Sequence, residues 1–396
     1  MRGLKYLENE KKLFSGRKAY LTTLKQNISK STDTCIIASP GFGKKTLLKE
    51  LVRQQEGIRS ALYYIDLSKA SLSPENLALE YMASFCDTQP NTNSLLQEKM
   101  SDECLSLVRT VDNELQKIKP DQQLILRSAL LFPEAYAKHL KKRLVIIMDC
   151  FEEFLQFNNY SQITKVLDIF TSTIHATAHV QSNAYTNTYV LTTSSALLKK
   201  GLAGFEFMEL SAFDETEAFE FIERSVGKVD VRLKRELFSL SRGIPAVLKS
   251  LCLRYRSASR KSNVSDELAL LRRLFVSELT VEFSRTHTYC KELFESSMNN
   301  ARGSSLLKSL VKVLAMHDDL KLSEIARLLY RSAPVTKSLI ERLIEVDLVR
   351  KSGSTFVFTN PVLKLWCRLS FQGIGFEEEP DDETLDEISN RLGGMA

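Results

Sequence analysis

The residues best suited to chemistry form a short glycine loop between an apolar run and a helical pattern. Residues 38–46 read ASPGFGKKT, and they lie between the apolar residues 35–37 and the sequence LLKELV at 47–52. A strand, glycine loop and helix in this order direct backbone N–H groups towards a phosphate at the helix N-terminus. The loop therefore predicts a nucleoside triphosphate site, with Gly41 and Gly43 shaping the turn and Lys44 binding phosphate. The alternative is a glycine turn that holds no ligand.

The loop departs from the complete phosphate-binding pattern, G-x-x-x-x-G-K-[ST], at two positions. Aligning Gly43 and Lys44 with the pattern puts Ala38 at the first glycine and Lys45 at the hydroxyl that ligates Mg²⁺. Thr46 follows one residue later, about 100° around the helix. A register that uses Lys45 and Thr46 restores the hydroxyl, but it puts Lys44 in the glycine position. We favour the first register, with Lys45 and Thr46 both kept as nucleotide-binding candidates.

A second group of candidates follows the apolar run at 144–148. Asp149 ends this run, where a strand-end carboxylate would hold Mg²⁺ through water. The alternative is an acid that caps the residues after the strand. The next position, where a water-activating glutamate is expected, holds Cys150, and a thiol is a poor base for water. Glu152 and Glu153 are therefore the candidate bases for any hydrolysis.

A third polar group, TTSS at 192–195, follows an apolar run at 189–191. Ser194 is predicted to sense the terminal phosphate from this strand end, and a hydroxyl-rich helix cap is the alternative. The expected ligands are ATP and Mg²⁺, with Asp149 and Thr46 as metal ligands. The absence of a guanine-reading NKxD motif favours adenine.

The elements that must position these residues alternate between strand and helix patterns. Apolar runs at 61–67, 144–149, 188–193 and 205–210 are separated by helical segments, which predicts an α/β fold with a parallel sheet covered on both faces. This P-loop NTPase core is expected over 1–210. A helical lid and connector follow over 211–300, then a winged helix over 301–372, read from three short helices and a strand–turn–strand pattern. Residues 373–396 are expected to form an acidic, flexible tail.

Bulk composition excludes several classes of protein. A net charge of +5 over 396 residues is too mild to imply nucleic acid binding by itself. Seven scattered cysteines without a CxxC pair argue against a disulfide framework and a zinc site, and they favour the reducing cytoplasm. No apolar run approaches the roughly 18 residues that a membrane helix needs, so we expect no membrane contact.

The order of these motifs resembles the archaeal-type ATPase family, part of the STAND branch of AAA+-related P-loop NTPases. The resemblance spans about residues 10 to 370, and it rests on short motifs whose order agrees. The matching pieces are Phe14-x-Gly16-Arg17, the glycine loop with Leu47-Leu48, the strand 145–149 with residues 151–153, the strand end 191–194, residues 210–213, Gly243-Ile244-Pro245 and residues 358–366. Phe42, within the glycine loop, is a further nucleotide-binding candidate.

This resemblance implies that Phe14 and Arg17 lie near the adenine base and that Pro245 contacts the nucleotide from a helical lid. The departures at Ala38, Lys45 and Cys150 weaken the case for hydrolysis more than the case for binding. The sequence thus predicts a nucleotide-dependent switch with slow or absent hydrolysis, compatible with an oligomer.

The predicted output is a protein or DNA contact made by the winged helix. Its third helix balances Lys337 and Arg342 against Glu341 and Glu345, whereas a DNA-reading helix normally has a basic face. Two alternatives stay open. One is a DNA-binding ATPase similar to the origin-recognition and Cdc6 proteins, and the other is a pseudo-ATPase scaffold that binds partners through the winged helix.

Overall fold

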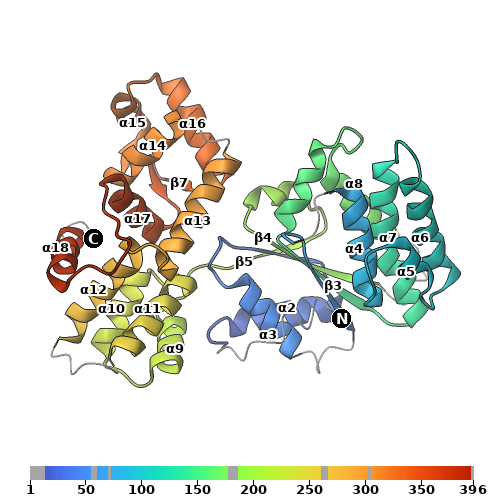
Figure 1. The fold of residues 1–396 in the computed structure, drawn as a ribbon, viewed down its shortest axis with the longest axis horizontal. Helices are drawn as coiled ribbons and strands as arrows, with labels where there is room; N and C mark the ends of the chain where they lie inside the picture. The colour runs from blue at the N-terminus through green and yellow to red at the C-terminus, as the bar shows by residue number, and fades with distance from the viewer. Residues whose placement is uncertain are drawn as a thin grey trace. The chain divides into compact units, whose positions relative to one another are not determined.

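The structure is a computed structural model that describes residues 14–54, 60–69, 73–176, 186–259, 266–301 and 305–393. The chain divides into two compact units (Figure 1). The first comprises Met1–Ala38 and Lys44–Leu210, and the second comprises Ser39–Gly43 and Ser211–Ala396. Each unit has its own hydrophobic core.

The first unit is built on a parallel sheet of five strands in the order β2-β3-β4-β1-β5. The strands are β1 (Thr34–Ile37), β2 (Ala61–Asp66), β3 (Leu144–Asp149), β4 (Thr188–Thr193) and β5 (Glu206–Glu209). Every residue of β1, β3 and β4 is buried, as expected for strands covered on both faces. The predicted α/β core with a parallel sheet is therefore confirmed.

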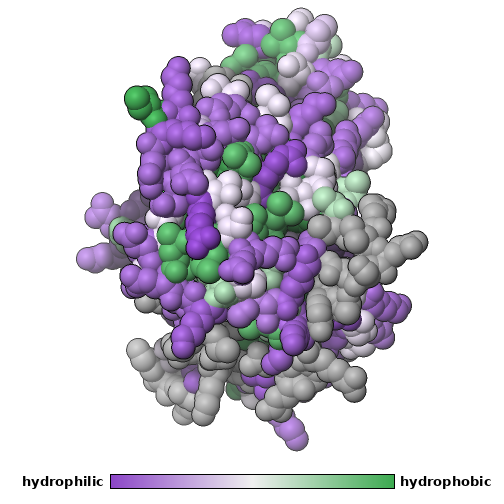
Figure 2. All heavy atoms as spheres, turned by 90° about the vertical axis from the view of Figure 1, so that its right-hand side faces the viewer, coloured by the Kyte–Doolittle hydropathy of each residue, from purple (hydrophilic) through white to green (hydrophobic). Residues whose placement is uncertain are grey.

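Helices cover this sheet. They are α2 (Lys18–Lys30), α3 (Lys44–Arg53), α4 (Pro74–Cys86), α5 (Thr92–Leu96), α6 (Asp102–Leu115), α7 (Gln122–Leu140), η2 (Phe151–Asn159), α8 (Val166–His175) and η3 (Ala196–Lys200). Figure 1 shows α2 and α3 together on one side of the sheet and α4 to α7 grouped on another. The face of this second group that Figure 2 presents is mostly hydrophilic. None of the helices that the structure describes is long and apolar enough to cross a bilayer.

The second unit is mainly helical and carries a small antiparallel sheet in the order β6-β8-β7. Its helices are α9 (Glu215–Val226), α10 (Val231–Ser241), α11 (Pro245–Ala258), α12 (Glu267–Thr280), α13 (Arg285–Asn300), α14 (Ser305–Met316), α15 (Leu322–Leu329), α16 (Ala333–Glu345), α17 (Pro361–Phe371) and α18 (Asp382–Gly393). Its strands are β6 (Leu320–Lys321), β7 (Val349–Ser352) and β8 (Thr355–Phe358). Gly353, with φ 59°, makes the tight turn between β7 and β8.

The acidic C-terminal segment is a docked helix, which corrects the expectation of a flexible tail. Leu385 and Ile388 of α18 are buried in the core of the second unit. Arg273 on α12 donates to Asp386 through two nitrogens, at 2.7 and 2.6 Å, and to Asp382 at 2.6 Å. The acids therefore attach the helix, and the two apolar residues at i, i+3 spacing give it a face to bury.

Candidate nucleotide site

The carboxyl edge of the parallel sheet carries Asp149 and the strand ends that lead to Lys44 and Ser194. Because the strands run in one direction, Asp66, Asp149 and Thr193 end β2, β3 and β4 at the same edge. Helix α3 begins at Lys44, shortly after β1 ends at Ile37. Ligands of open α/β sheets bind outside this edge, so the fold places the predicted residues where a ligand is expected.

The glycine loop has the backbone shape that phosphate binding needs. Gly41 and Gly43 have φ values of 81° and 93°, in the region that favours glycine. Ala38 is not among the described residues with positive φ, so an alanine at the first pattern position brings no backbone strain. The backbone N–H of Ala38 donates to Thr193 O at 3.0 Å, and the Lys44 ammonium donates to the Ala38 carbonyl. The loss of the first glycine thus leaves the loop geometry intact.

Two other predicted residues belong to the second unit. Phe42 packs on the hydrophobic core of that unit. Pro245 is the first residue of α11, and it follows Gly243, whose φ is 67°. A Cβ on Gly243 would lie 2.4 Å from the Phe213 carbonyl oxygen, so only glycine fits this turn. Within the same unit, the Ala246 N–H donates to Gly41 O at 3.1 Å.

Lys45 occupies the centre of the acidic group at the sheet edge. Its ammonium nitrogen lies 2.9 Å from Asp66 Oδ2 and 3.5 Å from Asp149 Oδ2. The hydroxyl of Tyr64 donates to Asp149 Oδ2 at 2.9 Å, and the hydroxyl of Thr192 donates to Asp149 Oδ1. Both carboxylates are buried, but each is paired with a cation and hydrogen-bonded, which is how buried charges are tolerated.

The opposite charges of Lys45 and the two acids stabilise one another's charged forms. Burial opposes the charged form of Lys45, but the hydrogen bond to Asp66 and the field of Asp149 outweigh it and raise the pKa of Lys45. Burial likewise opposes the charge of Asp66, while hydrogen bonds from Ser68 and Lys45 lower its pKa. Burial, followed by the field of Asp149, raises the pKa of the Cys150 thiol to about 12. Cys150 is therefore a neutral thiol at neutral pH and no base for water.

The donor set at this edge does not fit Mg²⁺. Asp66, Asp149 and Cys150 offer ligand atoms that all lie within 4.8 Å of one another. Mg²⁺ demands oxygen ligands, whereas one of these three is a thiol and the ammonium of Lys45 already contacts both carboxylates. Thr46, the predicted hydroxyl ligand, is exposed. These contacts argue against a metal shared by Asp149 and Thr46, because Lys45 rather than Thr46 turns towards the acid.

The candidate bases follow β3 on η2. The Ser194 hydroxyl donates to Glu152 Oε1 at 2.5 Å, and the Ser194 N–H donates to the same oxygen at 3.2 Å. The other oxygen of this carboxylate, Oε2, is buried and has no hydrogen-bond partner among the described residues. Burial, then the neighbouring Glu152, raises the pKa of Glu153, which accepts a hydrogen bond from Gln156. The structure thus brings Glu152 and Ser194 together and leaves Glu153 outside that pair.

Phe14 and Arg17 lie at the start of α2. Phe14 is partly buried, and Arg17 is buried at the N-cap position with a φ of 59°. The guanidinium of Arg17 lies over the ring of Tyr20, 5.3 Å from its centroid. This stacking fixes the arginine against the helix that precedes β1.

Asp66, Tyr64 and Ser68 belong to the site but were not among the predicted residues. Asp66 pairs in register with Asp149 across β2 and β3. Its signal in the sequence is the same as that of Asp149, an acid that ends an apolar strand run. Searching the end of every predicted strand for an acid, and not only the end of the 144–149 strand, would have identified Asp66.

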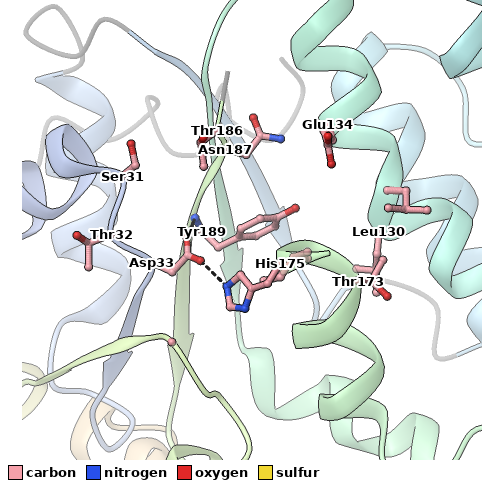
Figure 3. Close-up of a pocket in the computed structure, with 13 residues that line it drawn as sticks. Ser31, Thr32, Asp33, Leu130, Glu134, Thr173, His175, Thr186, Asn187 and Tyr189 are labelled. Carbon is pink, nitrogen blue, oxygen red and sulfur yellow. Dashed lines mark hydrogen bonds and ion pairs between the residues drawn. The ribbon is translucent and has the colours of Figure 1, made fainter. Parts of the chain in front are cut away.

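A separate cavity of about 350 Å³ lies at the opposite edge, where β1 and β4 begin (Figure 3). His175 Nε2 lies 3.0 Å from Asp33 Oδ2, and Asp33 Oδ1 also accepts from the Tyr189 N–H at 2.7 Å. None of the predicted site residues lines this cavity. Its polar groups join β1, β4 and α8, and we assign it no part in nucleotide binding, because ligands of parallel sheets bind at the carboxyl edge.

Comparison with known proteins supports the fold. No protein-family model matches the chain, and no curated protein matches it. Among solved structures, the Walker-type ATPase PABY2304 of Pyrococcus abyssi is 16% identical with a TM-score of 0.63, over 91% of this chain and 98% of that one. The ORC2 protein of Aeropyrum pernix, solved as ADPNP–ADP complexes, is 14% identical with a TM-score of 0.53, over 97% and 98%.

At these identities the likeness shows the fold alone. The chain has the fold of archaeal P-loop ATPases, with a parallel α/β core followed by a mainly helical second unit. The predicted resemblance to this group is therefore confirmed for the fold.

Proposed function

We propose that this chain binds ATP at the carboxyl edge of its sheet and acts as a STAND-like, nucleotide-dependent switch. One observation carries the proposal. Lys44 begins α3 directly after two glycines in the left-handed region, and the loop follows a fully buried strand of the sheet. This is the arrangement in which a helix N-terminus and its lysine bind phosphate. The fold likeness to two ATPase-type structures supports it.

The proposed switch hydrolyses ATP slowly or not at all. Hydrolysis needs a base that activates water, and the residue after Asp149 is a thiol whose pKa is raised to about 12. Glu152 has one oxygen, Oε2, without a hydrogen-bond partner among the described residues, and its other oxygen accepts from Ser194 at the end of β4. Glu153 is half-buried and bonded to Gln156, so we assign any residual turnover to Glu152.

The proposed output is a contact made by residues 301–372, in which α14, α15, α16 and the β6-β8-β7 sheet give a winged-helix order. Residues 211–300 would act as the lid and connector. On α16, Lys337 lies 3.8 Å from Glu341 and the Arg342 guanidinium donates to Ala301 O. These basic groups are engaged within the unit, which favours a protein partner.

The seven cysteines are all free, in keeping with the cytoplasm.

DNA binding is the second candidate, and a specific surface favours it. Tyr330 is 86% exposed between α15 and α16, and Arg327 and Arg331 beside it are exposed. Arg350 and Lys351 on β7 are exposed as well. If these residues bind DNA, affinity for a duplex should fall with salt, and the Arg350→Ala/Lys351→Ala double variant should reduce that salt dependence. Duplex binding that is absent at low salt would reject this candidate.

Thermal unfolding with and without ATP tests the primary proposal. A ligand at about 100 times its dissociation constant stabilises the folded state by about 2.7 kcal/mol, so the wild type should unfold several degrees higher with ATP. Lys44→Ala should lose this shift. If neither protein shifts, the sheet is a structural scaffold without a working nucleotide site, which is the pseudo-ATPase alternative.

A further inference from the structure

We infer that the Lys45 ammonium is a built-in cation of the nucleotide site, so that ATP binding here does not require Mg²⁺. The inference rests on the proposed ATP binding and specifies how the phosphate charge is neutralised. It follows from three features: the position of Lys45 in the loop pattern, the acids that hold it, and the protein partners that already engage each carboxylate oxygen.

The position of Lys45 is the one that a metal-binding hydroxyl occupies in the complete pattern. Lys45 follows Lys44 in the first turn of α3, and this turn contains no acidic residue. Two cations at a helix N-terminus oppose the helix dipole, which favours anions there. A bound phosphate chain offsets this repulsion, because its negative oxygens face both the dipole and the two ammonium groups.

The acids that would bind a metal through water hold Lys45 instead. The side chains of Asp66 and Asp149 are 6% and 4% exposed, whereas that of Lys45 is 40% exposed. The ammonium therefore contacts buried carboxylates, while the Lys45 side chain as a whole stays partly exposed. A divalent ion bound to these carboxylate oxygens would lie next to the Lys45 ammonium, which contacts the same oxygens. The two positive charges would repel each other.

Each carboxylate oxygen of the pair already accepts a hydrogen bond or an ion pair. Asp66 Oδ1 accepts from the Ser68 hydroxyl at 2.6 Å, and Asp66 Oδ2 accepts from Lys45. Asp149 Oδ1 accepts from Thr192, and Asp149 Oδ2 accepts from Tyr64. Mg²⁺ needs near-octahedral oxygen ligands, directly or through ordered water, whereas every carboxylate oxygen here already has a protein partner that a metal shell would have to share. Lys45 thus supplies, opposite these carboxylates, the positive charge that a metal ion would otherwise supply.

Isothermal titration of ATP into the full chain, in Mg²⁺ and in EDTA, tests this inference. The wild-type dissociation constant should change by less than about threefold between the two conditions. Lys45→Thr restores the hydroxyl of the pattern and removes the charge, so in EDTA it should bind ATP at least about tenfold more weakly than wild type, and Mg²⁺ should recover the loss. Lys45→Arg keeps the charge and should remain independent of Mg²⁺.

The outcomes separate the inference from the proposed function. Wild-type binding in Mg²⁺ that falls about tenfold or more in EDTA overturns the inference and leaves the proposed function standing. Absence of ATP binding in both conditions overturns both. The wild-type comparison needs no variant, so it decides the matter even if Lys45→Thr does not fold.

Discussion

The ammonium of Lys45 lies 3.5 Å from the carboxylate of Asp149, the acid that the sequence pattern assigns to a metal. The same ammonium lies 2.9 Å from Asp66, which is aligned with Asp149 on the neighbouring strand. A lysine between two strand-end acids places an ammonium group against two carboxylates, in the same helical turn as Lys44. Phosphate binding and slow hydrolysis are consistent with this arrangement, because the charge is present but the water-activating acid is replaced by Cys150.

The retained glycine of the loop, Gly43, and the altered position, Ala38, should respond differently to mutation. Gly43→Ala places a Cβ at a φ of 93°, which costs about 1–2 kcal/mol in the left-handed region, and it should weaken ATP binding by about tenfold. Ala38→Gly should leave affinity within about threefold, because Ala38 does not have a positive φ. Titration calorimetry on both variants checks this. Equal losses in the two variants would mean that the loop conformation does not set affinity.

Residual ATP turnover should depend on Glu152 and not on Glu153. We expect wild-type turnover below about 1 s⁻¹, at the low end for enzymes. Glu152→Gln should lower it by about a hundredfold, the usual contribution of a positioned base, with ATP affinity unchanged. Glu153→Gln is the matched control, since it is the adjacent acid but bonds Gln156 rather than Ser194. Equal turnover in wild type and Glu152→Gln, measured by phosphate release, would exclude Glu152 as the base.

The attachment of α18 should weaken in acid. The hydrogen bond from Arg273 holds the pKa of Asp386 below its usual range. A folded-state pKa below the unfolded value contributes stability that is complete above about pH 4 and is lost as the pH falls through the folded pKa. Amide hydrogen exchange of residues 382–393 should therefore accelerate at low pH relative to the rest of the second unit.

Asp386→Asn should reproduce this acid effect at neutral pH, because it removes the charge that Arg273 binds. Glu387→Gln is the control, since Glu387 pairs with Arg391 on α18 itself. Exchange of α18 that is the same in Asp386→Asn and Glu387→Gln would show that burial of Leu385 and Ile388 alone holds the helix.

The sequence predicted the strands of the core well, because a buried parallel strand reads as a continuous apolar run. The runs at 144–149 and 188–193 match β3 and β4. The order β2-β3-β4-β1-β5 could not be read from the sequence, since it depends on pairings between distant segments. The role of Asp66 was hidden for the same reason: it matters only because β2 lies beside β3.

Two other differences have local causes. The pattern of 377–388 is dominated by acidic residues, so its two buried apolar positions, Leu385 and Ile388, were not recognised as a helix face. The pairing of Lys45 with two acids was not predictable either, because a lysine in a glycine loop normally points to phosphate. Its position became visible only with both strand ends in place.

Direct titration of ATP into the wild type, Lys44→Ala and Lys312→Ala tests the central claim most directly. Lys312 is an exposed lysine of α14, in the second unit, and serves as the matched control. We predict that wild type and Lys312→Ala bind ATP with the same affinity, and that Lys44→Ala binds about tenfold to a hundredfold more weakly, as expected for loss of one charged contact to phosphate. Equal affinity in all three proteins, or no binding to the wild type, would contradict a nucleotide site at Lys44.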